Sequence, residues 1–268
     1  VTEYYDAGQQ QPKTTTSYTN GMPNGTHTEY SVDGRVLVRG WFKQGEMDST
    51  WTHFYSGGTA KSIENYKSGF LNGTSAYYYK NKIIAQTTNH IKGLAEGEWK
   101  LYYENGSPQA TEHYVKGKKQ GVWSNYYKTG GIQSQCTYSN DVLNGQYQEW
   151  HTGSNTNKLK CSGMYIMGQK TGTWTTFYPN GSVIQKGHYQ DSTWYLDELY
   201  TSSNPNSAYD IIPEINFFHL IKIFPPLKIP DCECNSNFHS YYSVQKSISS
   251  IEAKRCKVHG LPSLKISC

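Results

Sequence analysis

The chain has 268 residues, a formal net charge of +4 and a mean hydropathy of −0.74. Only 17% of its residues are charged, whereas 15% are aromatic, mostly Tyr. This aromatic content argues against a charged, disordered chain. The basic residues are dispersed, so no stripe suited to a phosphate backbone is predicted, and no apolar run of about 18 residues predicts a transmembrane segment.

The sequence begins at Val1 rather than Met, as expected for a chain that has lost a leader and equally for a partial chain. Aromatic residues and glycines follow at once. These first residues resemble one incomplete copy of a unit that returns further along the chain.

The unit is 24 residues long. Residues 97–120 read GEWKLYYENGSPQATEHYVKGKKQ, and residues 121–144 read GVWSNYYKTGGIQSQCTYSNDVLN. Counting each unit from its first residue as position 1, the units start at Gly25, Ser49, Gly73, Gly97, Gly121, Gly145 and Gly172, the last one after an excess of three residues. Matching positions over successive steps of equal length indicate an internal repeat.

Four features recur within the unit. An aromatic pair occupies positions 6 and 7 in most units, as in Tyr102-Tyr103, and Gly is frequent at position 10. Two further columns of rings occupy position 3 (Trp51, Trp99, Trp123, Tyr147 and Trp174) and position 18 (Phe42, Tyr66, His90, Tyr114, Tyr138, Tyr165 and Tyr189).

Each unit is predicted to form a β-hairpin. Aromatic runs of about seven residues alternate with Asn-Gly, Gly-Gly and Lys-Gly turns, in which glycine tolerates positive φ. A unit of this length is too short for a parallel crossover, and no apolar helical stripe runs through it. We therefore expect an all-β fold: a single-layer twisted ribbon of stacked antiparallel hairpins over residues 1–192, advancing about 10 Å per unit.

The pattern G-x-W-x-x-Y-Y-x-x-G…Y-x-x-G resembles the MORN repeat, and more closely its bacterial-type variant with an antitoxin-like description. The likeness covers about residues 4–192 but lacks the Tyr-x-Gly-x-x-x-x-Gly-x-Gly core of the standard repeat. The resemblance implies a ribbon of stacked hairpins that mediates protein association or lipid contact. It brings no catalytic residues and no cofactor.

Residues 193–268 depart from the repeat and are expected to form a separate Cys-rich segment that caps the ribbon or takes part in assembly. Their four cysteines, Cys232, Cys234, Cys256 and Cys268, favour two disulfides, because a small segment with little core needs covalent links. Zinc is the alternative, with His239 and His259 as further ligands, although the spacing matches no common finger.

Two more cysteines, Cys136 and Cys161, fall on the second strands of successive hairpins. One strand should lie between them, which places their Cα atoms about 9–10 Å apart, beyond the reach of a disulfide. We expect them not to bond to each other unless the three extra residues bend the ribbon. They would instead pack as small apolar residues or pair with the tail.

Four Asn-x-Ser/Thr sequons occur. Asn24 and Asn72 share the turn between units, whereas Asn105 and Asn180 share the turn in the middle of a hairpin. All four are expected to be exposed at the ribbon edges, as glycosylation requires. Turns also demand Asn and Gly for their own geometry, so the sequons can be purely structural.

No catalytic or metal-binding motif is found, and the chain is not expected to be an enzyme. His90, His113 and His151 lie at or beside ring positions and are predicted to substitute for rings. The acidic residues, Glu64 and Glu112 among them, are not expected to form a recurring column, so no pair of catalytic carboxylates is nominated.

These features favour an extracellular structural glycoprotein that self-associates end to end through its sheet edges and its C-terminal segment. One alternative is a binding module whose exposed ring columns take a protein or glycan ligand. Another is an intracellular antitoxin-like scaffold. A count of free thiols distinguishes these hypotheses, because cysteines stay reduced in an intracellular protein and form disulfides in an extracellular one.

Overall fold

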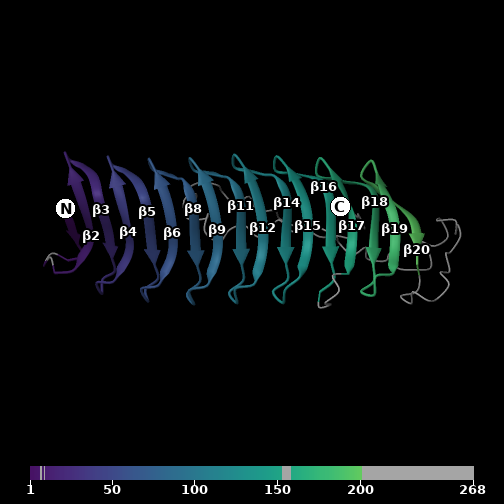
Figure 1. The fold of residues 1–268 in the computed structure, drawn as a ribbon, viewed down its shortest axis with the longest axis horizontal. Coiled ribbons are helices and arrows are strands. Elements are labelled where there is room, and N and C mark those ends of the chain that lie inside the picture. The colour runs from purple at the N-terminus through teal and green to yellow at the C-terminus, as the bar shows by residue number, and fades with distance from the viewer. Residues whose placement is uncertain (7, 9, 153–157, 201–268) are drawn as a thin grey trace, which may run out of the picture. The chain divides into compact units, whose positions relative to one another are not determined.

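A computed structural model describes residues 1–6, 8, 10–152 and 158–200. They form one open antiparallel sheet of 20 strands, with no helix among them (Figure 1). The strands are β1 (Thr2–Tyr4), β2 (Pro12–Thr19), β3 (Met22–Tyr30), β4 (Val36–Lys43), β5 (Glu46–Phe54), β6 (Ala60–Lys67), β7 (Phe70–Leu71), β8 (Gly73–Tyr78), β9 (Ile84–Ile91), β10 (Leu94–Ala95), β11 (Gly97–Tyr102), β12 (Pro108–Val115), β13 (Lys118–Lys119), β14 (Gly121–Tyr126), β15 (Ile132–Ser139), β16 (Val142–Trp150), β17 (Leu159–Ile166), β18 (Gln169–Phe177), β19 (Val183–Gln190) and β20 (Thr193–Leu199).

The predicted fold is confirmed: each unit is a hairpin, and each hairpin pairs with the next one along the chain. The sheet continues beyond residue 192, because β20 pairs with β19 from Gln190↔Thr193 to Gln185↔Leu199. The chain divides into Val1–Cys234 and Asn235–Cys268, and all described residues belong to the first unit. The predictions for Cys232, Cys234, Cys256 and Cys268, and for zinc at those residues, lie outside the described residues.

The turns between units all have the same two-residue form. Both central residues have positive φ, as in Lys92 (50°) with Gly93 (80°), and Asn140 (48°) with Asp141 (72°). This conformation defines a type I′ turn, whose twist matches that of the strands it connects. The first central residue is not glycine in any of them; three are Asn or Asp, which tolerate this conformation, and the others are Gln, Ser, Lys or Met, which seldom adopt it.

Backbone hydrogen bonds connect most of these turns to the one before it. Gly69 N donates to Met47 O at 2.9 Å, and Gly93 N donates to Leu71 O at 2.8 Å. These bonds satisfy backbone groups at the sheet edge that would otherwise need water. Neighbouring hairpins are therefore joined at their turns as well as along their strands.

The turns within the hairpins vary in length. Tyr127 N donates to Gly131 O across a short turn, while His151 N makes the same bond to Lys158 O across a turn three residues longer. The three-residue excess predicted for this unit is thus accommodated between β16 and β17. The pairing of those two strands is kept, from Gly145↔Tyr165 to Trp150↔Leu159.

Two glycines allow a tryptophan ring to lie flat on the backbone. A Cβ on Gly40 would come within 2.2 Å of the Trp51 ring, and a Cβ on Gly163 within 2.1 Å of the Trp174 ring. Gly40 and Gly163 both occupy position 16, as does Gly187, where a Cβ would come within 2.4 Å of the Trp194 ring; the other units carry larger residues there. The ring therefore rests on the preceding strand only because that strand has no side chain there.

We predict that Gly40→Ala destabilises the protein by about 1–3 kcal/mol, because the added methyl must push the Trp51 ring out of place. The control is Gly57→Ala, since a Cβ at Gly57 meets no atom within 4 Å. Urea unfolding followed by Trp fluorescence measures both variants. Equal stability of the two would show that the Trp51 ring is not fixed against this strand.

Candidate interaction surface

The two predicted ring columns meet on one face of the sheet and pack alternately. The ring centroids of Trp99 and Tyr114 lie 4.7 Å apart, those of Tyr114 and Trp123 lie 5.2 Å apart, and those of Trp123 and Tyr138 lie 5.0 Å apart. The same contacts join Trp51 to Tyr66 and Trp174 to Tyr189. These offset and edge-to-face pairs form a row of rings across the strands.

This row forms the core of the sheet. Trp51, Trp123 and Trp174 are only 4%, 6% and 4% exposed. The indole nitrogens are satisfied internally, since Trp123 Nε1 donates to His113 O at 3.2 Å and Trp99 Nε1 donates to Asn89 O at 3.1 Å. These three rings therefore offer no exposed face to a ligand, contrary to the hypothesis of an open ring face, whereas Trp99, Tyr114 and Tyr189 are half-buried.

The unit that starts at Gly73 interrupts the row with polar residues. Position 3 holds Ser75, and Thr88 and His90 follow on the paired strand. In the described part of the chain, five buried side-chain atoms lack a hydrogen-bond partner, and all but Thr176 Oγ1 belong to this unit: Ser75 Oγ, Gln86 Nε2, Thr88 Oγ1 and His90 Nδ1. This unit is the polar segment of an otherwise aromatic core.

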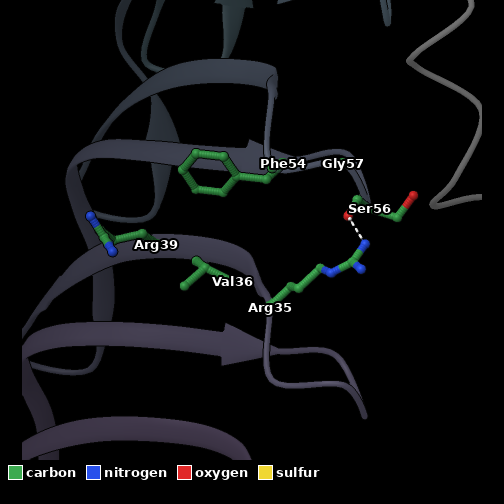
Figure 2. A pocket seen from close by; sticks show the side chains of 7 residues that line it. Arg35, Val36, Arg39, Phe54, Ser56 and Gly57 are labelled. Carbon is green, nitrogen blue, oxygen red and sulfur yellow. Dashed lines mark hydrogen bonds between the residues drawn. The ribbon is translucent and has the colours of Figure 1, made fainter.

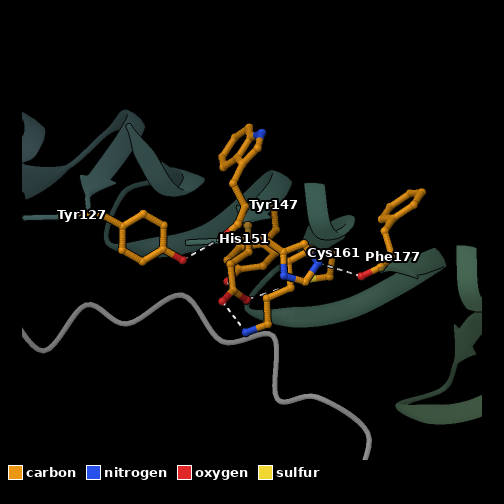
Figure 3. Close-up of polar contacts among 8 residues, drawn as sticks. Tyr127, Tyr147, His151, Cys161 and Phe177 are labelled. Carbon is orange, nitrogen blue, oxygen red and sulfur yellow. Dashed lines mark hydrogen bonds and ion pairs between the residues drawn. The ribbon is translucent and has the colours of Figure 1, made fainter. Parts of the chain in front are cut away.

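The predicted role of His90 and His151 as ring substitutes is confirmed. His90 packs against Trp99 with a centroid distance of 5.1 Å, and burial lowers its pKa. His151 occupies position 7 and donates from Nε2 to Phe177 O at 2.8 Å (Figure 3). His113 is exposed and contributes only its carbonyl, which accepts from Trp123.

The side chains at position 7 form a row of hydrogen bonds between units, which the sequence did not reveal. Its tyrosine hydroxyl donates to the backbone carbonyl of position 6 in the next unit, as in Tyr103 to Tyr126 O (2.8 Å) and Tyr127 to Trp150 O (2.7 Å; Figure 3). The other members are Tyr5, Tyr55, Tyr79 and His151. We call this row the tyrosine ladder. It joins most hairpins to the next at the edge opposite the type I′ turns.

The expectation that acidic residues do not recur in a column was wrong for two of them. Glu64 and Glu112 both occupy position 16, and each accepts a hydrogen bond from the tyrosine two residues later, Tyr66 and Tyr114, at 2.9 Å. The two carboxylates are two units apart, about 20 Å along the sheet. That separation is too large for paired acid and base catalysis.

Burial governs the ionisation of Glu112. Its pKa is raised above the usual 4.5, first because the carboxylate loses its hydration, while the Tyr114 hydrogen bond and the charge of Lys119 oppose the shift. The pKa of Tyr114 is raised as well, by burial and by the neighbouring carboxylate. The core therefore contains a carboxyl group that holds its proton more strongly than a solvated glutamate does.

The raised pKa makes stability depend on pH. The folded protein retains the Glu112 proton to a higher pH than the unfolded chain, so the free energy of unfolding falls as pH rises from 4.5 through the raised pKa. We predict that Glu112→Gln removes this fall, because the amide still accepts from Tyr114 but has no charge. Urea unfolding across that range tests it, with the exposed Glu98→Gln as control. A fall unchanged in Glu112→Gln would contradict the assignment.

The sequon asparagines differ in exposure. Asn105 and Asn180 are exposed, as expected, but Asn24 and Asn72 are half-buried, which corrects the prediction for those two. Asn24 Oδ1 accepts from Gln44 N and Asn72 Oδ1 accepts from Lys92 N, both at 3.2 Å, so each ties its turn to the next. Asn105 and Asn180 each accept from a backbone N–H two residues later. Turn geometry alone thus explains all four asparagines.

Cys136 and Cys161 lie on β15 and β17 with β16 between them, as predicted. They are 1% and 0% exposed, and both are disulfide-bonded, so neither packs as a free thiol. Cys161 Sγ is 4.0 Å from the Glu149 carboxylate, which also forms an ion pair with Lys160 at 2.6 Å (Figure 3). Which cysteine each one bonds to stays a prediction.

An exposed apolar row follows the type I′ turns. It combines positions 19 and 22 of successive units, and we call it the apolar turn row; its members are Phe70, Ile91, Leu94, Val115, Val142 and Ile166, each 38–59% exposed. Polar residues lie between its members, because Phe70 pairs with Lys67, Val115 with Lys118 and Val142 with Ser139. Exposed apolar side chains that gather on one part of a surface are typical of an interaction site.

Among the residues that the structure describes, no three His, Cys, Asp or Glu side chains gather where they could hold a metal ion. The same residues include no helix of the length and hydropathy needed to cross a membrane.

The family model described as "MORN repeat variant" matches residues 95–116, 119–140 and 170–191. Every match begins two residues before a unit start and ends at the first central residue of a type I′ turn, so the family repeat and the structural hairpin have the same phase. A search of curated proteins finds no match to the chain.

Proposed function

Because this chain is a MORN-repeat protein, we propose that it is a non-enzymatic extracellular scaffold whose copies assemble end to end through the edges of the sheet. The openness of the sheet is the observation that carries this proposal. Among the described residues, β1 pairs only with β2, and β20 pairs only with β19. Within the part of the chain that the structure describes, each of these strands therefore has one side without a paired strand.

Both edge strands have exposed residues that could take part in such a contact. All three residues of β1 are exposed, and β20 spans Thr193–Leu199 with alternating exposure. An edge strand offers a row of backbone donors and acceptors, and pairing with a strand from another copy satisfies them. The contact joins two different edges, so it does not close on itself and extends into a filament.

A second candidate function is a binding module for another protein, and the apolar turn row favours it. Phe70, Ile91 and Leu94 are 59%, 53% and 52% exposed along neighbouring units. An apolar strip of this kind suits the apolar side chains of a protein better than the hydroxyls of a glycan. Under this hypothesis the ribbon holds its partner along one edge rather than at its ends.

We predict that Tyr195→Lys on β20 abolishes concentration-dependent assembly, because a charge on an edge strand opposes further strand pairing. Sedimentation velocity over a range of concentrations and negative-stain microscopy measure assembly. The control is Trp41→Lys, which changes a similarly exposed aromatic residue (45% against 47%) on β4, inside the sheet. A wild-type protein that remains monomeric at high concentration contradicts end-to-end assembly.

The two candidate functions respond differently to changes in the apolar turn row. Phe70→Ser combined with Leu94→Ser leaves the edge strands unchanged, so end-to-end assembly persists in that variant. Binding of a partner along the row would instead be lost. This double variant therefore separates the scaffold from the binding module.

An extracellular location is supported by the disulfide-bonded state of Cys136 and Cys161, since disulfides persist in oxidising compartments. The exposed Asn105 and Asn180 support glycosylation at the turns within the hairpins. An intracellular antitoxin-like scaffold would instead have six reduced cysteines.

Intact mass of the secreted protein tests location and modification together. We predict that reduction adds two hydrogen atoms per disulfide, and that enzymatic deglycosylation lowers the mass of the wild type but not that of Asn105→Gln combined with Asn180→Gln. Asn24→Gln combined with Asn72→Gln is the matched control and should retain its glycans. Six free thiols before reduction would contradict the extracellular proposal.

A further inference from the structure

The tyrosine ladder is interrupted in the unit that starts at Gly25. Position 7 of that unit is Ser31, whose hydroxyl donates within its own turn, to Asp33 and to Arg35 O. The corresponding tyrosine in the next unit, Tyr55, reaches across to Tyr78 O at 2.7 Å. No side chain at position 31 reaches the equivalent carbonyl, Phe54 O.

A pocket occupies this place in the ladder. It has a volume of about 270 Å³ and is lined by Arg35, Val36, Arg39, Phe54, Ser56, Gly57 and Gly58. Figure 2 shows the Phe54 ring and Arg39 on one side of the opening and Arg35 with Ser56 on the other. This volume lies below the roughly 300–1,000 Å³ of pockets for drug-sized ligands, so it suits a single ring.

The two arginines have different roles. Arg35 is held by the protein itself, because Nη1 donates to Ser56 O at 2.8 Å and Nε pairs with Asp33 at 3.0 Å. It links one turn to the next, as Asn81 does when Nδ2 donates to Glu104 O. Arg39 is exposed, and its side chain forms no hydrogen bond or ion pair with another described residue. Its guanidinium is therefore available to an anion.

We propose that this pocket binds a para-hydroxyphenyl ring that carries a carboxylate or adjoins one. The ladder supplies the template for the ring, since Tyr5, Tyr55, Tyr79, Tyr103 and Tyr127 all place such a ring at the equivalent position. The bound ring packs against Val36 and Phe54, and its hydroxyl donates to Phe54 O. Arg39 pairs with the carboxylate.

Titration of the full chain with 4-hydroxyphenylacetate, followed by ligand-detected NMR, tests the proposal. We expect saturable binding with a dissociation constant of about 1 mM, as for a ligand of this size in a small site. Removing either polar group weakens binding about tenfold, so both phenylacetate and 4-hydroxyphenylacetamide bind less well. Equal binding of all three compounds overturns the proposal.

Two variants locate the ligand. Ser31→Tyr restores the missing member of the ladder, so it should abolish binding and raise the unfolding temperature. Arg39→Gln should weaken binding of the acid about tenfold and leave that of the amide unchanged. Lys82→Gln is the control for a change of surface charge, because Lys82 lies in the mid-hairpin turn of a unit whose ladder position holds Tyr79. Undiminished binding to Ser31→Tyr or Arg39→Gln overturns the proposal.

The source of the ring is decided by a blocked peptide, acetyl-Asp-Tyr-Asp-amide. Tighter binding of this peptide than of 4-hydroxyphenylacetate identifies a tyrosine of an acidic protein segment as the ligand. Weaker binding of the peptide identifies a free phenolic acid. The proposal fails if neither compound competes with the other for the wild-type protein.

Discussion

The structure depends on the packing of tryptophan against tyrosine between neighbouring hairpins. A single-layer sheet has no second layer to cover its apolar face, so the rings must bury one another. Trp123 is 6% exposed because Tyr114 and Tyr138 flank it at 5.2 and 5.0 Å. Trp123 thus packs against Tyr138 of its own hairpin and Tyr114 of the preceding one, so contacts within a unit and contacts between units both contribute to stability.

Glycine and lysine complete this packing in specific units. Gly40 and Gly163 let an indole lie on the strand before it. Lys119 Nζ lies 4.6 Å from the Trp123 ring centroid and 5.1 Å from the Tyr138 ring centroid, so it makes a cation–π contact with both rings. The polar unit around Ser75 lacks a tryptophan at position 3, and its buried hydroxyls have no hydrogen-bond partner. The core is therefore uneven along its length, even though its backbone repeats regularly.

The sequence predicted the hairpins and the ring columns because both follow from a fixed period. Spacing alone placed Trp99 beside Tyr114. It could not show whether that column faces a ligand or the core, since exposure depends on how closely rings from neighbouring units approach. The tyrosine ladder was missed for a similar reason: the bond from Tyr103 to a backbone carbonyl depends on three-dimensional register and not on the partner's residue type. Asn24 was expected to be exposed because its use as a hydrogen-bond acceptor for the next turn has no sequence signal.

The turns on the two long edges of the sheet differ in how much their length and conformation vary. Every turn on one edge has two central residues in the left-handed region, and the turns bond to one another in sequence. On the other edge the chain crosses from Tyr127 to Gly131 in one unit and from His151 to Lys158 in another without disturbing the strands. The edge with the type I′ turns is therefore constant and sets the spacing between hairpins. The opposite edge can carry connecting segments of different lengths at regular intervals. A ribbon of this kind can acquire new recognition loops on its variable edge, because the constant edge preserves the fold.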